Sequence, residues 1–124
     1  MGLNIPRKDI WRRDGEAIAV NRQPEENDMS RAYWIVRVSV RDEQRYPEYL
    51  AAAGPAFQNF GAKFVVRGGA FETMEGNARD RNVVVEFKDR ATALACYHSP
   101  EYQNAKAIRQ KYADADFIII DGAA

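Results

Sequence analysis

The order of strand-like and helix-like segments is the feature that most constrains what this chain can fold into. Four segments are rich in β-branched and aromatic residues, as strands are: 33–40, 63–67, 82–87 and 117–120. Two longer segments carry apolar residues at helical spacing, 42–61 and 89–112, and Ser99 and Pro100 divide the second into two pieces. The β-α-β-β-α-β order predicts an α+β fold of the ferredoxin-like type, in which a four-stranded antiparallel sheet carries two helices on one face.

Several details of the chain path follow from capping and turn residues. The first helix is expected to begin near Asp42, which can cap free backbone N–H groups, and to end at Gly61. Gly68 predicts a bulge or sharp bend after the second strand. The segment 71–75 could continue that strand as far as a turn at 76–77.

The chain of 124 residues has room for one domain. Residues 31–122 are predicted to form it, because the regular pattern is confined to them. Residues 1–30 show no sustained hydrophobic period and are interpreted as an N-terminal arm or extension. Met29 directly precedes the first strand, so it could be the original translation start.

Composition argues against several classes of protein. Lys plus Arg and Asp plus Glu are both 18, so the chain lacks the basic surplus typical of nucleic-acid binders. No apolar run approaches the roughly 20 residues that span a bilayer. Cys96 is the one cysteine, which fits a reducing compartment. The pair Arg12 and Arg13 is followed by charged residues and too short an apolar piece for an export signal, so a cytoplasmic location is expected.

Strand alternation predicts that the sheet has an apolar second face. Trp34, Val36 and Val38 fall on one side of the first strand, and Tyr33, Ile35, Arg37 and Ser39 fall on the other. The last strand is apolar on both sides. Because a monomer would leave this second face in water, we expect a homodimer that covers it.

Three charged residues are expected on that second face and define a candidate site. Arg37, Arg67 and Glu86 alternate onto it, and Arg37 can meet Glu86 because the first and third strands are neighbours in this fold. Such charges are costly to bury unless they are paired or bind a ligand. In one interpretation, one or both arginines hold a carboxylate or another anion and Glu86 acts as a general base; in the other, the three residues form ion pairs that fix the dimer register.

Other polar residues allow two interpretations each. His98 is the one histidine, and it is either a proton shuttle beside the helix break or a surface histidine at a helix end. Tyr46 and Tyr102 either place hydroxyl groups on a ligand or pack in the core. Cys96 lies two residues before His98 in a helix, on a different side, so it is predicted to be a small core residue.

No metal or organic cofactor is expected. Gly68 and Gly69 lack the lysine and serine or threonine of a phosphate-binding loop. One histidine and one cysteine cannot form a zinc site, and the acidic residues lack the spacing of a calcium loop.

The motifs of the chain resemble a known family. They are, in order, the first strand, the helix with Gly54 and Pro55, Arg67-Gly68-Gly69, Val83 to Phe87, Ser99-Pro100-Glu101-Tyr102-Gln103, Arg109, and the closing strand up to Asp121 and Gly122. Over about residues 31–122 they are similar to DUF1330, a family of small bacterial proteins of unknown function. The resemblance implies membership of the dimeric α+β barrel superfamily, with two sheets packed into a barrel-like homodimer.

Two functions from different classes remain open. Relatives in that superfamily include cofactor-independent monooxygenases, dye-decolourising peroxidases, muconolactone isomerases and regulatory modules, so the fold does not choose an activity. The first reading is a dimer that binds a small, anionic molecule at the sheet face through Arg37, Arg67, Tyr46 and Tyr102. The alternative is a cofactor-independent enzyme, monooxygenase- or isomerase-like, for a small organic acid or aromatic. In it, Glu86 or His98 moves a proton and Arg67 holds an oxyanion.

Overall fold

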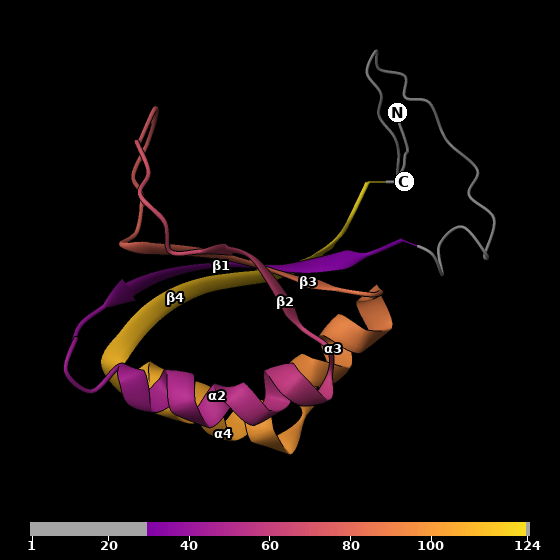
Figure 1. The fold of residues 1–124 in the computed structure, drawn as a ribbon. Coiled ribbons are helices and arrows are strands. Elements are labelled where there is room, and N and C mark those ends of the chain that lie inside the picture. The colour runs from indigo at the N-terminus through magenta and orange to yellow at the C-terminus, as the bar shows by residue number, and fades with distance from the viewer. Residues whose placement is uncertain (1–29, 124) are drawn as a thin grey trace, which may run out of the picture.

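The computed structural model describes residues 30–123 and shows one sheet covered by helices on one face (Figure 1). Its elements are β1 (Ala32–Val40), α2 (Pro47–Asn59), β2 (Lys63–Arg67), β3 (Arg81–Phe87), α3 (Arg90–His98), α4 (Pro100–Tyr112) and β4 (Ala113–Asp121). The strands are antiparallel in the order β2-β3-β1-β4. This arrangement confirms the predicted ferredoxin-like α+β fold.

The core lies between the sheet and the helices, and Trp34 of β1 is at its centre. The Trp34 side chain is 1% exposed, and its indole N–H donates a hydrogen bond to the Ala93 carbonyl oxygen at 3.0 Å. Its ring centre lies 5.1 Å from that of Phe87 and 4.8 Å from that of Tyr102. Val36 and Val38 are buried on the same side, so the predicted alternation of β1 is confirmed.

Two capping residues set where α3 and α4 begin. The Asp89 carboxylate accepts a hydrogen bond from the Thr92 N–H at 2.8 Å. Ser99 ends α3 by donating to the Cys96 carbonyl oxygen at 2.7 Å and begins α4 by accepting from the Tyr102 N–H at 3.1 Å. The predicted break at Ser99 is therefore confirmed.

The helix α2 begins later than predicted, at Pro47 instead of near Asp42. The Asp42 carboxylate accepts hydrogen bonds from the N–H groups of Gln44 and Arg45, both at 3.1 Å. These bonds form a turn that precedes the helix, and Pro47 suits the first helical turn because it has no N–H to leave unpaired. Gly61, with φ of 65°, follows the helix, as predicted.

The strand β2 contains a bulge at Val65. Phe64 pairs with Val85 and Val66 pairs with Val84, so Val65 is an extra residue without a cross-strand partner. Because Val85 is buried under the helices, Phe64 faces the helices and Val66 faces the opposite side. We call that opposite side, which carries Tyr33 and Ile35, the open face.

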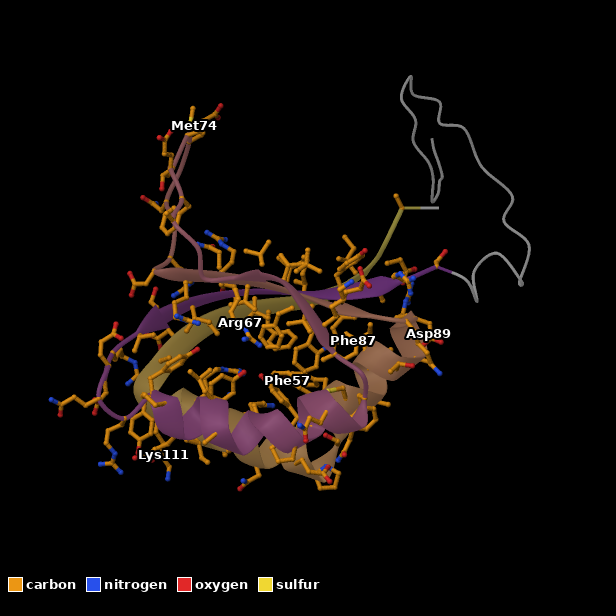
Figure 2. The ribbon with its side chains drawn as sticks, viewed as in Figure 1. Phe57, Arg67, Met74, Phe87, Asp89 and Lys111 are labelled. Atoms are coloured by element: carbon orange, nitrogen blue, oxygen red, sulfur yellow. The ribbon has the colours of Figure 1, made fainter. Side chains whose placement is uncertain are left out.

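The connection between β2 and β3, residues 68–80, stands away from the sheet on its open-face side (Figure 1). We call it the β2–β3 loop. The prediction that 71–75 continues the strand is wrong, since the structure has no strand there. The predicted sharp bend is present, because Gly68 has a φ of 65°, a conformation that suits glycine. The Met74 side chain lies at the tip of the loop (Figure 2).

The predictions for residues 1–30, including Met29 as a translation start, fall almost entirely outside the described residues. Within residues 30–123, no helix is both long enough and apolar enough to cross a membrane.

Candidate functional site

The three charged residues expected to form a site on the open face do not converge. Glu86 pairs with Tyr33, whereas Arg37 pairs with Asn82, four residues further along β1. Four residues of strand separate the two positions by about 13 Å. Arg67 pairs with Val83, on the helix side, because the bulge at Val65 reverses the alternation after it. The expectation that these three residues share one pocket is therefore wrong.

Glu86 lies within a local polar group on the open face. It accepts a hydrogen bond from the Tyr33 hydroxyl at 3.2 Å, and its carboxylate lies 3.4 Å from the Nε of Arg31. The Glu86 side chain is 21% exposed. These contacts favour the interpretation in which Glu86 forms an ion pair over the one in which it acts as a general base.

Arg37 supports the base of the β2–β3 loop. Its Nη2 donates a hydrogen bond to the Asn77 carbonyl oxygen at 3.0 Å. Asp116, the residue opposite Arg37 on β4, is paired instead with Arg79, whose Nε lies 2.9 Å from the carboxylate. The structure therefore uses Arg37 to hold the loop.

Arg67 lines a groove between α2 and β2, which we call the α2–β2 groove. Figure 2 shows Arg67 and Phe57 between the sheet and the helices. The groove has a volume of about 490 Å³ and is lined by Gly54, Pro55, Phe57, Gln58, Ala62, Phe64 and Arg67. The guanidinium carbon of Arg67 lies 3.9 Å from the centre of the Phe64 ring. The groove thus offers two aromatic rings and one positive charge.

His98 is the last residue of α3, and its side chain is exposed. Its ring lies edge-on to that of Tyr97, with the ring centres 5.2 Å apart. The structure does not bring His98 together with Glu86, which lies on the open face.

A group of tyrosines and arginines fills part of the space between the sheet and the helices. We call it the Arg–Tyr cluster: Tyr46, Tyr49, Arg81, Tyr102 and Arg109. The Tyr49 and Tyr102 hydroxyls are hydrogen-bonded at 2.8 Å, and Arg109 Nη1 donates to the Tyr102 hydroxyl at 2.6 Å. Tyr102 is 0% exposed and Arg109 is 5% exposed. The two tyrosines proposed from the sequence therefore belong to one buried polar group.

Neither arginine of the Arg–Tyr cluster has an acidic partner among residues 30–123. No carboxylate lies within salt-bridge distance of Arg81 or Arg109 there, and the buried Nε atom of each has no hydrogen-bond partner. The guanidinium carbon of Arg81 lies 5.8 Å from the centre of the Tyr46 ring, and that of Arg109 lies 5.5 Å from the centre of the Tyr49 ring. Aromatic faces thus supply part of the electrostatic compensation.

Two tyrosines of the cluster, Tyr46 and Tyr102, stay protonated at neutral pH. Burial raises the pKa of Tyr102 far above that of a phenol in water. Burial also raises the pKa of Tyr46, although Arg81 and Arg109 both act to lower it. These hydroxyls can donate and accept hydrogen bonds, but they are poor general bases at neutral pH.

Neither Arg81 nor Arg109 is among the site residues predicted from the sequence, although the sequence contains one signal for Arg109. Tyr102, Ala105 and Arg109 fall at helical spacing on one stripe of α4, and all three are buried. An arginine on an otherwise apolar stripe indicates a buried charge. Arg81 carries no such signal, because its side is set by its pairing with Val38.

Cys96 is a core residue, as predicted. Its thiol is buried, and the sulfur lies 3.7 Å from the Ala56 carbonyl oxygen. Burial raises the pKa of the Cys96 thiol to about 12. Among the described residues, no group of three or more histidine, cysteine, aspartate or glutamate side chains is placed to hold a metal ion.

Comparisons with known proteins agree with this fold. The RPA0582 protein of unknown function from Rhodopseudomonas palustris is 20% identical, with a TM-score of 0.65 over 77% of this chain and 85% of that one. SnoaB, a cofactor-independent oxygenase from Streptomyces nogalater, is 11% identical, with a TM-score of 0.53 over 77% and 95% of the two chains. A dimeric protein of unknown function and ferredoxin-like fold from Bacteroides fragilis is 12% identical, with a TM-score of 0.47 over 74% and 96%.

At these identities the likeness to RPA0582 and SnoaB shows the fold alone. No functionally curated protein matches the chain. Residues 31–123 match the family described as "Domain of unknown function (DUF1330)", which confirms the resemblance seen in the sequence. The chain belongs to the DUF1330 family, whose function is unknown.

Proposed function

We propose that this protein binds a small oxyanion, of the carboxylate class, at the Arg–Tyr cluster. The observation that carries the proposal is Arg109, which is 5% exposed and has a buried Nε without a partner. Removing an ion from water costs several kcal/mol, and a buried charge is normally matched by an opposite one. A bound anion would supply the charge that residues 30–123 do not.

The geometry favours an anion that accepts several hydrogen bonds. Arg109 already gives one N–H to Tyr102, which leaves its Nε–H as a donor, and Arg81 has a second unpaired Nε–H. Arg81 lies over the Tyr46 ring and Arg109 over the Tyr49 ring, and the centres of these two rings lie 5.5 Å apart, so both guanidinium groups adjoin one tyrosine pair. Carboxylates suit such sites because each oxygen can accept from a different donor.

The same proposal includes a homodimer formed through the open face. A row of four apolar side chains crosses that face, one from each strand: Val66, Val84, Ile35 and Ile118. Val66 is 41% exposed and Ile118 is 54% exposed. A second copy related by a two-fold axis would lay one such row on the other and remove both from water.

The geometry supports ligand binding more strongly than the alternative of a cofactor-independent enzyme. That alternative needs Glu86 or His98 to move a proton beside an oxyanion held by Arg67. Glu86 lies on the open face, His98 lies at the exposed end of α3, and Arg67 lies in the α2–β2 groove. Proton transfer requires donor and acceptor within hydrogen-bond reach, and these three residues lie on different parts of the molecule.

Titration calorimetry with acetate, benzoate, succinate and inorganic phosphate tests the proposal. We expect at least one carboxylate to bind the wild type and none to bind Arg109→Met. Lys111→Met is the matched control, because it removes an exposed positive charge from the same helix. Equal binding by Arg109→Met, or no binding of any of the four probes by the wild type, would refute the proposed site.

A further inference from the structure

The β2–β3 loop has a fixed base and an uncovered tip. Besides the contact from Arg37 to Asn77, Arg79 bonds both Asp116, at 2.9 Å, and the Ser39 hydroxyl, at 3.0 Å. Towards the tip, every residue from 69 to 78 is exposed, including Phe71 at 50% and Met74 at 83%. A segment held so firmly at its base, with two large apolar side chains in water, is suited to contact another molecule.

The length of the loop exceeds the spacing of two packed sheets. Each leg holds about five residues, and at about 3.3 Å per residue it can reach roughly 17 Å. Packed sheets lie about 10 Å apart. The loop stands on the open-face side (Figure 1), so with a second copy on that face its tip would pass beyond the plane of the partner's sheet.

The α2–β2 groove lies on the far side of that plane, at the edge of the sheet that β2 forms. A two-fold axis that lies between the two sheets, parallel to them and perpendicular to the strands, would lay each β2 over the partner's β2, running in the opposite direction. The loop leaves β2 after Arg67, at its C-terminal end. It would therefore stand beside the N-terminal end of the partner's β2, where Phe64 lines the groove.

The chemistry of the loop matches that of the groove. Glu72 and Glu75 are the charged residues of 68–78, and they flank Met74. The groove combines the Phe57 and Phe64 rings with the guanidinium of Arg67. Methionine sulfur packs well against aromatic rings, and carboxylates pair with guanidinium groups.

We propose that the β2–β3 loop of each copy docks into the α2–β2 groove of a second copy of this chain. Met74 packs on Phe57 and Phe64, and Glu72 or Glu75 faces Arg67. This inference rests on the homodimer of the proposed function, but it does not depend on the anion site.

Sedimentation equilibrium of the full chain measures the contribution of the loop tip to dimerisation. We expect Met74→Asp to raise the dimer Kd roughly tenfold or more, because a charge replaces an apolar side chain that becomes buried. Leu94→Asp is the matched control, since Leu94 is an exposed apolar residue of α3, at 39%, and should dimerise as the wild type does. A wild-type Kd for Met74→Asp would overturn the docking proposal alone, whereas a monomeric wild type would overturn the dimer with it.

A charge exchange tests the partner residue. Arg67→Glu should weaken the dimer, and adding Glu72→Arg and Glu75→Arg to it should restore much of the lost affinity. Failure of the triple variant to regain affinity over Arg67→Glu would contradict the pairing.

A photo-reactive benzoylphenylalanine at position 74 locates the contact directly. In mixtures of isotopically light and heavy protein, we expect cross-links from position 74 to residues 54–67 of the other copy. Cross-links to residues 1–29, to the same copy, or to no part of the chain would overturn the proposal.

Discussion

Replacing Arg109 with methionine separates a binding role for this residue from a structural one. Methionine has a similar length and no charge, so it can fill the space among the aromatic rings around Arg109. The substitution removes the hydrogen bond from Arg109 to the Tyr102 hydroxyl, but Tyr102 keeps its bond to Tyr49 at 2.8 Å. No polar group of Tyr102 is therefore left without a partner.

The expected change in the free energy of unfolding follows from two opposing contributions. The lost hydrogen bond involves a charged donor and is worth about 1.5–3 kcal/mol. The removed desolvation penalty of a buried, unpaired ion is several kcal/mol. We therefore expect the free energy of unfolding of the ligand-free protein to stay unchanged or to rise by about 1–2 kcal/mol. A domain of this size responds to 1 kcal/mol with a change in Tm of roughly 4–8 °C.

Urea unfolding and calorimetry of extensively dialysed protein provide the measurement, with native mass spectrometry to show that no small molecule is retained. Arg109→Met should unfold at the same or a higher urea concentration than the wild type and should gain no stability from added carboxylate. A ligand at 100 times its Kd should stabilise the wild type by about 2.7 kcal/mol. A loss of more than about 2 kcal/mol in ligand-free Arg109→Met would mean that the guanidinium is a structural group and would refute its role as an anion-binding group.

Three further predictions concern the helices. Ser99→Ala should lower the free energy of unfolding by about 1–2 kcal/mol in urea titrations, because it removes the cap of α4 and the bond to the Cys96 carbonyl oxygen; an unchanged midpoint would contradict this. Since burial raises the pKa of Cys96 to about 12, iodoacetamide should label it at neutral pH after unfolding and not before, as read by mass spectrometry. Hydrogen bonding from Thr92 lowers the pKa of Asp89, so its charge stabilises the fold above the ordinary aspartate pKa and this contribution is lost as pH falls through the lowered value. The stability difference between the wild type and Asp89→Asn should therefore shrink in acid, and a difference that grows in acid would refute the assignment.

The parts of the fold that depend on local pattern could be predicted from the sequence. The alternation of Trp34, Val36 and Val38 identified the buried side of β1, because burial of a strand has a period of two residues. Ser99 and Pro100 marked the division between α3 and α4, because a cap followed by proline is a local signal. Local signals of this kind were enough to predict the order of the strands and helices and the resemblance to the family.

The parts of the fold and of the site that depend on contacts between residues distant in sequence could not be predicted. The offset of four residues between Arg37 and Glu86 is set by the register of β1 against β3, and no pattern within either strand encodes that register. The buried position of Arg109 depends on Tyr49 and Tyr102, which come from two different helices. Counting arginine as a surface residue is usually correct, and it fails here because the rings of Tyr49, Tyr102 and Phe117 surround the charge.

The extra residue at Val65 makes β2 more tolerant of a change in length than of a change in composition. The cross-strand pairs before and after Val65 would form a regular ladder without it, so loss of one codon would leave each of those pairs intact. Exchanging two neighbouring residues such as Val66 and Arg67 would instead place the charged side chain on the open face and the apolar one on the helix side. Aligning relatives by spacing alone would therefore assign Arg67 to the wrong layer wherever this residue is gained or lost.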